Sequence, residues 1–243
     1  MALMKSVLAV SASVVVSLGL VACGDNANSG QGGHSAYERE GDFAKGNPNA
    51  PLTLVEYASV ACGHCATFHE DAMPGVEEQI EAGNVRFVFR EMLTGQPQVA
   101  AAGFMLAHCA GEDKYFDMVD ILFDQQRAIF EAGQRGAMRQ QLSTIARSVG
   151  FSEAEFEACL TNQEILDEIT NNNKRSSDDG ITGTPSFVVN GKTLSFTRME
   201  GQDTPVFALD DEPILIDGAP LTYTFNAEDW SRVLAHLAAE QQG

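Results

Sequence analysis

Residues 52–65, LTLVEYASVACGHC, place a β-prone segment directly before a Cys-x-x-Cys motif. The first six of these residues are mostly apolar, β-branched or aromatic, which predicts a strand over 52–57. Residues 66–82 then have the composition of a helix, which we expect Pro74 to kink. Residues 85–90, VRFVFR, predict a second strand. The order strand–helix–strand predicts a βαβ unit with both cysteines at the start of its helix.

Apolar side chains recur at helical spacing through residues 98–177, unlike the region before them. Within this stretch Ser152 and Glu155 have the spacing of a capping box, which predicts a helix start. The sequence therefore predicts an all-helical block inserted between strands of an α/β fold.

The β pattern returns at residues 185–189, and Asn190-Gly191 predicts a hairpin turn after it. Asn226 is expected to cap a final helix. Residues 195–220 are acidic and contain three prolines. They show no periodicity that predicts an element.

The Cys62-Gly63-His64-Cys65 motif has the chemistry of a redox site. A cysteine at a helix N-terminus lies near unpaired N–H groups and the positive end of the helix dipole, which stabilise thiolate over thiol. We therefore expect Cys62 to be the exposed nucleophile and Cys65, one turn further in, the resolving thiol. His64 could add a positive charge near Cys62 and lower its pKa further.

Two other interpretations of the motif remain open at this point. One is a structural disulfide between Cys62 and Cys65. The other is a metal site in which His64 and His69 join the two cysteines. Zinc sites built on Cys-x-x-Cys usually recruit a second ligand pair, and the sequence contains no second motif of that kind. By itself, His69 is most simply a surface or packing histidine.

The N-terminus has the pattern of an export signal. Residues 7–21 form an apolar run that is short for a membrane span and typical of a signal peptide. The run ends in Leu20-Val21-Ala22-Cys23, which resembles the bacterial lipobox. We expect a lipoprotein signal peptide over residues 1–22, lipidation of Cys23 and a flexible tether over 23–40. The protein would then be periplasmic and held at a membrane, where disulfides persist.

Composition limits the remaining function classes. With 44% apolar residues and 243 positions, the chain can bury the core of a globular body. Its formal net charge of −19 argues against nucleic acid and anionic membrane surfaces as partners.

Several motifs in order resemble the DsbA-like branch of the thioredoxin superfamily. They are Val55-Glu56-Tyr57, the Cys62–Cys65 motif, the helical insertion, and Gly183-Thr184-Pro185 before a late strand. Residues 105–111 and 156–160, around Cys109 and Cys159, resemble the four-cysteine members. The resemblance implies a thioredoxin-like domain over residues 41–97 and 178–243, with an inserted helical domain over 98–177.

The resemblance also implies roles for individual residues. Pro185 would be a cis-proline facing the redox site, so that the backbone of Thr184 can pair with an extended substrate. Glu56 would be a buried acid that moves protons to or from Cys65. Cys109 and Cys159 would form a structural disulfide.

These features together predict an enzyme that oxidises dithiols of exported proteins without an organic cofactor. A membrane redox partner, by resemblance quinone-linked, would reoxidise it. The short region before residue 50 predicts a monomer rather than a dimeric isomerase. A reductase or isomerase remains the alternative, because threonine before the proline also occurs in isomerase-like relatives. Outside enzymes, the chain could be a lipid-anchored adaptor or metal chaperone.

Overall fold

The computed structural model describes residues 35–201 and 203–242 of the chain. The predicted signal peptide, the lipidation site Cys23 and residues 23–34 of the predicted tether lie outside the described residues.

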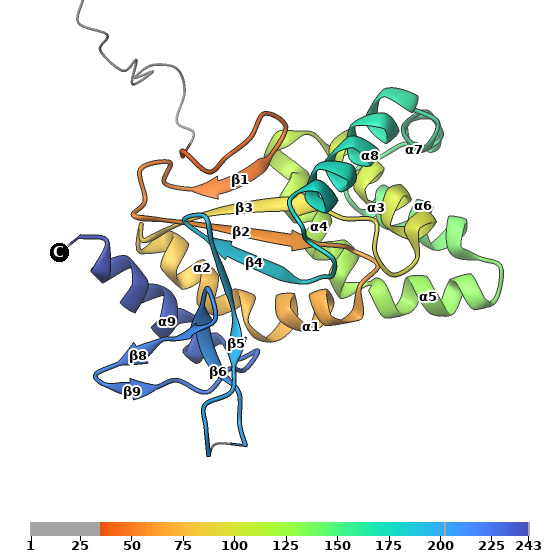
Figure 1. Cartoon of the computed structure of the whole chain (residues 1–243). Helices are drawn as coiled ribbons and strands as arrows, with labels where there is room; N and C mark the ends of the chain where they lie inside the picture. The colour runs from red at the N-terminus through yellow and green to blue at the C-terminus, as the bar shows by residue number, and fades with distance from the viewer. Residues whose placement is uncertain (1–34, 202, 243) are drawn as a thin grey trace, which may run out of the picture. The chain divides into compact units, whose positions relative to one another are not determined.

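The centre of the fold is a mixed sheet built around the predicted βαβ unit (Figure 1). Strands β2 and β3 pair in parallel, and the other neighbouring strands of this sheet pair antiparallel. The strand order is β1-β3-β2-β4-β5-β6-β7. The bounds are β1 Phe43–Gly46, β2 Leu52–Ala58, β3 Val85–Glu91, β4 Ser186–Val189, β5 Lys192–Thr197, β6 Val206–Leu209 and β7 Glu212–Pro213.

The crossover between β2 and β3 contains two helices rather than one kinked helix. Helix α1 spans Gly63–Asp71 and α2 spans Met73–Glu81, separated at Ala72. Pro74 lies in the first turn of α2, where its missing N–H leaves no hydrogen bond unmade. The prediction of one helix over residues 66–82, kinked at Pro74, is thus wrong: the chain breaks at Ala72, and Pro74 lies at the start of the second helix. Helix α9, Ala227–Glu240, packs against α2, and Asn226 caps it as predicted.

Six α-helices form the predicted insertion between β3 and β4, and Figure 1 shows them gathered beyond one end of the central strands. The Ser152–Glu155 capping box is present at the start of α7. None of the helices in the described part of the chain is long and apolar enough to cross a membrane. The helices are α3 Pro97–Ala110, α4 Tyr115–Asp124, α5 Gln126–Gln134, α6 Met138–Ser148, α7 Glu153–Leu160 and α8 Gln163–Asp178, with a 3-10 turn at Glu112–Lys114.

The segment 195–220, for which the sequence predicted no element, extends the sheet and adds a small hairpin. Strands β6 and β7 continue the sheet beyond β5, while β8, Leu215–Ile216, pairs with β9, Ala219–Pro220. Asp210, Asp211 and Asp217 adopt positive φ angles and turn the chain, a conformation that aspartate tolerates better than most residues. Strands of two to four residues are too short to give a periodic signal.

The predicted tether is too long at its C-terminal end, because the chain is already packed on the sheet before residue 40. Arg86 of β3 pairs with Glu38, whose side chain is 2% exposed. Arg90 donates a hydrogen bond to the carbonyl oxygen of Tyr37 and pairs with Asp42. These contacts attach Ser35–Glu40 to the folded body.

Strand β2 is buried along its whole length, with side chains alternating between the two faces of the sheet. Leu52 and Leu54 join the main core together with Phe68 of α1, whereas Val55 and Tyr57 belong to a separate cluster. Glu56 follows the alternation of Leu52 and Leu54. The carboxylate is therefore directed to the face that carries the main core.

Candidate active site

Cys62 is the N-cap of α1, as the sequence predicted. Its backbone is extended, with φ −103° and ψ 119°, and its Sγ accepts a hydrogen bond from the backbone N–H of Cys65 at 3.4 Å. The Cys62 side chain is partly exposed, while Cys65 is fully buried, and both are free thiols. One sulfur can therefore meet a substrate while the other is sheltered.

The two thiols differ strongly in acidity. A hydrogen bond from the Cys65 side chain, with further hydrogen bonds from Thr184 and the backbone N–H groups of Cys65 and His64, outweighs burial and lowers the pKa of Cys62 to about 6. Burial, the hydrogen bond to Cys62 and the negative charge of Glu56 raise the pKa of Cys65. Near neutral pH, Cys62 is the thiolate and Cys65 holds the proton.

His64 follows Cys62 in the first turn of α1, and its side chain is exposed. Its backbone N–H contributes to the lowered pKa of Cys62.

The loop before β4 lies against the cysteine motif. The Thr184–Pro185 peptide bond is cis, as expected from the resemblance. Cys62 Sγ lies 3.3 Å from the carbonyl oxygen of Thr184, to which its thiol form donates a hydrogen bond, so the two segments meet although they are 122 positions apart in sequence. The hydroxyl groups of Thr184 and Thr94 hydrogen-bond at 2.6 Å, which fixes the threonine beside the site.

Sequence reasoning missed two side chains that hold the cysteine loop. Gln126, the first residue of α5, donates to the carbonyl oxygens of Val60 and Cys62. Ser59 donates to the carbonyl oxygen of Thr94. Gln126 is 7% exposed and comes from the helical insertion, so the insertion directly positions the redox loop. No local sequence signal marks such a long-range contact.

Glu56 is buried, as the resemblance implied, and its partner is His69, which the sequence by itself indicated only as a surface or packing histidine. The carboxylate is fully inaccessible, and its Oε2 lies 2.9 Å from Nε2 of His69. The His69 side chain is 6% exposed. His69 lies four residues after Cys65, hence on the same inward face of α1, and this spacing was the available signal.

The second cysteine pair lies away from this site, within the helical insertion. Cys109 near the end of α3 and Cys159 in α7 form a disulfide, with 6.1 Å between their Cα atoms. The bridge joins the two helices across 50 positions of sequence. It has the place of a structural bridge, as the resemblance implied.

No group of three or more His, Cys, Asp or Glu side chains within residues 35–201 and 203–242 is arranged to hold a metal ion. In particular, Nε2 of His69 faces Glu56 rather than the two cysteines.

Comparison with known proteins defines the class to which this arrangement belongs. A family model described as thioredoxin matches residues 38–214, more than half of the chain. The chain therefore belongs to the thioredoxin family, and its fold is the thioredoxin fold with an inserted helical domain.

Within that family the similarity is to DsbA-type proteins. The chain superimposes on Wolbachia pipientis alpha-DsbA1 with a TM-score of 0.64 and 22% identity, covering 84% of this chain and 94% of that one. The TM-score with Bacillus subtilis BdbD is 0.61 at 18% identity, covering 84% and 95%. A Rickettsia typhi protein named as a protein-disulfide oxidoreductase is 30% identical over 153 residues, which are 62% of this chain and 55% of that protein. The match thus spans about half the length of that relative.

Proposed function

We propose that the protein is a thiol–disulfide oxidoreductase that oxidises dithiols of exported proteins through a Cys62–Cys65 disulfide. The observation that carries the proposal is the placement of the two thiols: Cys62 is partly exposed at the N-cap of α1, where its pKa is lowered to about 6, and Cys65 is buried, which raises its pKa. A stabilised Cys62 thiolate favours the reduced dithiol form, which makes the disulfide a stronger oxidant. The name of the Rickettsia typhi relative, a protein-disulfide oxidoreductase, supports the same reaction class.

The exchange takes place in two steps. A substrate thiolate attacks Sγ of Cys62, the Cys62–Cys65 bond breaks, and Cys65 leaves as a thiolate that its raised pKa causes to take up a proton. A second substrate thiolate then attacks the substrate sulfur of the mixed disulfide and releases Cys62 as a thiolate. Two electrons pass from substrate to enzyme. The two substrate thiols lose two protons, of which Cys65 retains one.

Substrate would bind where Thr184 meets Cys62. The carbonyl oxygen of Thr184 lies 3.3 Å from the reactive sulfur. A peptide aligned along this backbone segment in an extended conformation would bring its cysteine to Cys62, in the manner of strand addition.

The direction of electron flow is tested by equilibrating the Cys62–Cys65 couple with glutathione. We expect a potential closer to about −180 mV, typical of protein disulfide isomerase, than to about −270 mV, typical of thioredoxin. Refolding of a reduced and of a scrambled disulfide protein then separates oxidation from isomerisation. A potential like that of thioredoxin, or efficient rescue of the scrambled protein with little oxidation of the reduced one, contradicts the proposal.

The cellular setting is part of the same proposal. The apolar run before Leu20-Val21-Ala22-Cys23 supports export, with Cys23 lipidated and the body in the periplasm near a membrane. A membrane redox partner would reoxidise a monomeric enzyme. Intact mass of the membrane-extracted protein should start at Cys23 with added acyl mass. A mature form that starts elsewhere contradicts the anchor, and light scattering tests the monomer.

A further inference from the structure

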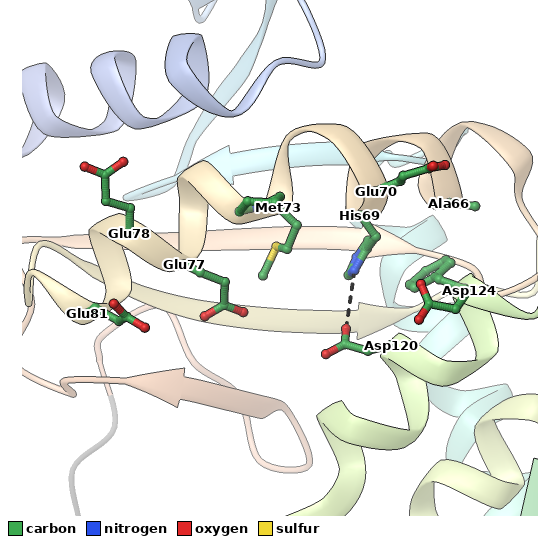
Figure 2. Close-up of a pocket in the computed structure, with 11 residues that line it drawn as sticks. Ala66, His69, Glu70, Met73, Glu77, Glu78, Glu81, Asp120 and Asp124 are labelled. Atoms are coloured by element: carbon green, nitrogen blue, oxygen red, sulfur yellow. Dashed lines mark ion pairs between the residues drawn. The ribbon is translucent and has the colours of Figure 1, made fainter.

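An acidic groove runs beside the active-site helix, between α1–α2 and α4 (Figure 2). Its volume is about 700 Å³. Met73, Pro74 and Phe123 form part of its wall, and the carboxylates that line it are Glu70, Glu77, Glu78, Glu81, Asp120 and Asp124. Acidic side chains clustered on a surface are ordinarily only solvated, so the groove alone does not indicate a function. What distinguishes it is the side chain that links it to the core behind the cysteines.

His69 lines the groove and also reaches the buried core behind the cysteines. One ring nitrogen, Nε2, is 2.9 Å from Glu56 Oε2, and the other, Nδ1, is 3.7 Å from Asp120 Oδ1. Figure 2 shows His69 and Asp120 pointing toward one another across the groove. Nδ1 is buried and has no hydrogen-bond partner among the described residues. The imidazole therefore connects a buried carboxylate with one that is 53% exposed.

The imidazole is held in place by packing on both sides. Its ring stacks on Phe123 of α4 with 4.1 Å between centroids, and Phe68 and Phe89 contact it edge-on. These apolar neighbours leave only the two ends of the ring for polar contacts. The ring is thus oriented along the line from Glu56 to the groove.

The buried end of this line is Glu56, whose charge acts on the resolving thiol Cys65. Glu56 is fully inaccessible, and within residues 35–201 and 203–242 its Oε1 has no hydrogen-bond partner. Its charge acts on Cys65, which is itself fully buried and must take up or release one proton in every exchange. Among the described side chains His69 alone hydrogen-bonds to Glu56. A proton that reaches Glu56 from solvent therefore has His69 in its path.

We propose that Glu56, His69 and Asp120 form a proton route between Cys65 and the acidic groove, with His69 as the connecting group. When Cys65 leaves as a thiolate, Glu56 passes a proton to its sulfur, and His69 gives its Nε2 proton to Glu56. His69 enters this step doubly protonated, with an Nδ1 proton taken from the groove through Asp120, and leaves it neutral with that proton still on Nδ1 and Nε2 free to accept. In the reverse direction, Cys65 gives up its proton along the same path before it attacks Cys62. No electrons move along the route.

The charges around His69 favour a protonated ring. Burial alone would lower the pKa of His69, but the charges of Glu56 and Asp120, with the hydrogen bond to Glu56, raise it to about 9. The surrounding charged groups are Glu56 from β2, Asp120 and Asp124 from α4, and Glu70 and Glu77 from α1 and α2, with Lys45 of β1 paired to Glu77. A cationic ring between carboxylates can donate its Nε2 proton to Glu56 at neutral pH while Nδ1, which faces Asp120 and the groove, stays protonated.

The route rests on exchange at Cys62–Cys65 but holds for either direction of electron flow. A reducing potential would contradict the proposed oxidase and leave the route intact. The test must therefore measure the rate at which Cys65 attacks a Cys62–glutathione mixed disulfide, rather than the equilibrium potential. Rapid acid quenching and mass spectrometry follow this single step.

The decisive variant is His69→Gly, assayed with and without added imidazole. We expect the Cys65 step to slow by about 10²-fold, the lower end of general acid–base contributions. Imidazole entering through the groove should restore most of the loss in a saturable manner. His108→Gly is the matched control, since it removes the other buried imidazole that pairs with a glutamate. Its exchange rate should not respond to imidazole.

Asp120→Asn provides a second test on an exposed residue whose change leaves the core intact. The Cys65 step needs a neutral ring to accept the proton, so its rate should rise with pH through the pKa of His69. Removing the Asp120 charge should lower that pKa and move the rising limb of the pH–rate profile to lower pH. An unshifted profile in Asp120→Asn overturns the route. A wild-type rate in folded His69→Gly, or a slow rate that imidazole does not restore, overturns it as well.

Discussion

Residues 35–201 and 203–242 contain two buried glutamate–histidine pairs, and these differ in their remaining contacts. Glu56 and His69 lie behind the Cys62–Cys65 site, whereas Glu91 of β3 and His108 of α3 join the sheet to the helical insertion. In each pair a histidine Nε2 is 2.9 Å from a carboxylate oxygen, and both carboxylates are almost completely buried. The shared chemistry makes the contrast in their remaining contacts informative.

Glu91 has its hydrogen-bonding capacity occupied. Besides His108, it accepts a hydrogen bond from the hydroxyl of Tyr115 at 2.9 Å and from Asn172 of α8 at 3.3 Å. Three elements of the insertion thus meet on one carboxylate. A buried acid with several donors links elements together and has little capacity left for chemistry.

In Glu56, by contrast, Oε1 has no hydrogen-bond partner within the described structure. Nδ1 of His69 has none there either. A buried polar atom left unpaired costs roughly 1–3 kcal/mol, so its presence calls for an explanation. Proton transfer with Cys65 supplies one. The two pairs therefore illustrate how the number of partners separates a structural carboxylate from one at a working site.

The largest contrast is expected between cysteines of the two regions. Cys62→Ser should abolish thiol–disulfide exchange, because Cys65 is buried and its pKa is raised. Cys109→Ser should leave exchange at the active site largely intact at temperatures where the protein remains folded. Reaction with oxidised glutathione, followed by mass spectrometry, measures both. Residual exchange in Cys62→Ser would show that Cys65 can act as the nucleophile.

Removing the second bridge should act on stability. The Cys109→Ala/Cys159→Ala variant loses a cross-link across 50 positions, for which chain entropy suggests about 4 kcal/mol of unfolding free energy. Urea unfolding of the oxidised wild type and of the variant measures the difference. The pH dependence of Cys62 alkylation should not change, with a midpoint near pH 6 in both. A changed midpoint would mean that the two regions are coupled.

The Glu56–His69 pair should give the folded protein a stability that depends on pH. The folded pKa of His69, about 9, lies above its unfolded value of about 6.5. The associated stabilisation is therefore complete below about pH 6.5 and is lost as pH rises to about 9, with a limit of about 3 kcal/mol. Urea unfolding between these pH values should show this loss in wild type and not in His69→Asn. Cys62 titrates in both proteins, so its contribution to the pH dependence is common to them. If the unfolding free energy depended on pH equally in the two proteins, the raised pKa of His69 would be contradicted.

A smaller difference is expected when each carboxylate is replaced by its amide. Glu91→Gln should lower the unfolding free energy by about 2 kcal/mol, because the amide cannot accept from all three donors of Glu91. Glu56→Gln affects only one donor and should cost less stability, while it slows the Cys65 step much more. Paired unfolding and single-turnover measurements compare the two. If Glu56→Gln cost more stability than Glu91→Gln and slowed the Cys65 step less, the distinction between a structural and a working carboxylate would fail.

The sequence alone was sufficient for the parts of the molecule that rest on local signals. The strand before Cys62, the helical character of the crossover after it, the capping box at Ser152 and the Asn190-Gly191 turn each depend on neighbouring residues, and all are present. The redox motif was identifiable for the same reason, since helix position and spacing govern the acidity of a thiol.

Other features escaped prediction because their determinants are distant in sequence or too short to be periodic. Strand β1 has four residues with no distinctive pattern and is fixed by pairing with β3. The hairpins in residues 195–220 depend on aspartates at positive φ. The predicted tether, residues 23–40, extends too far toward the C-terminus, because only the folded sheet shows that Arg86 pairs with Glu38.

The sequence thus determined where the reactive cysteines are and which elements flank them, because those facts follow from local spacing. Only the tertiary structure decided the acidity of the two thiols and which groups lie close enough to exchange protons with them. The placement of Thr184 against Cys62, of Gln126 on the cysteine loop and of His69 between Glu56 and Asp120 arises from packing elements far apart in the chain. Acidity depends on burial and on charges in space, and neither can be read from the order of residues.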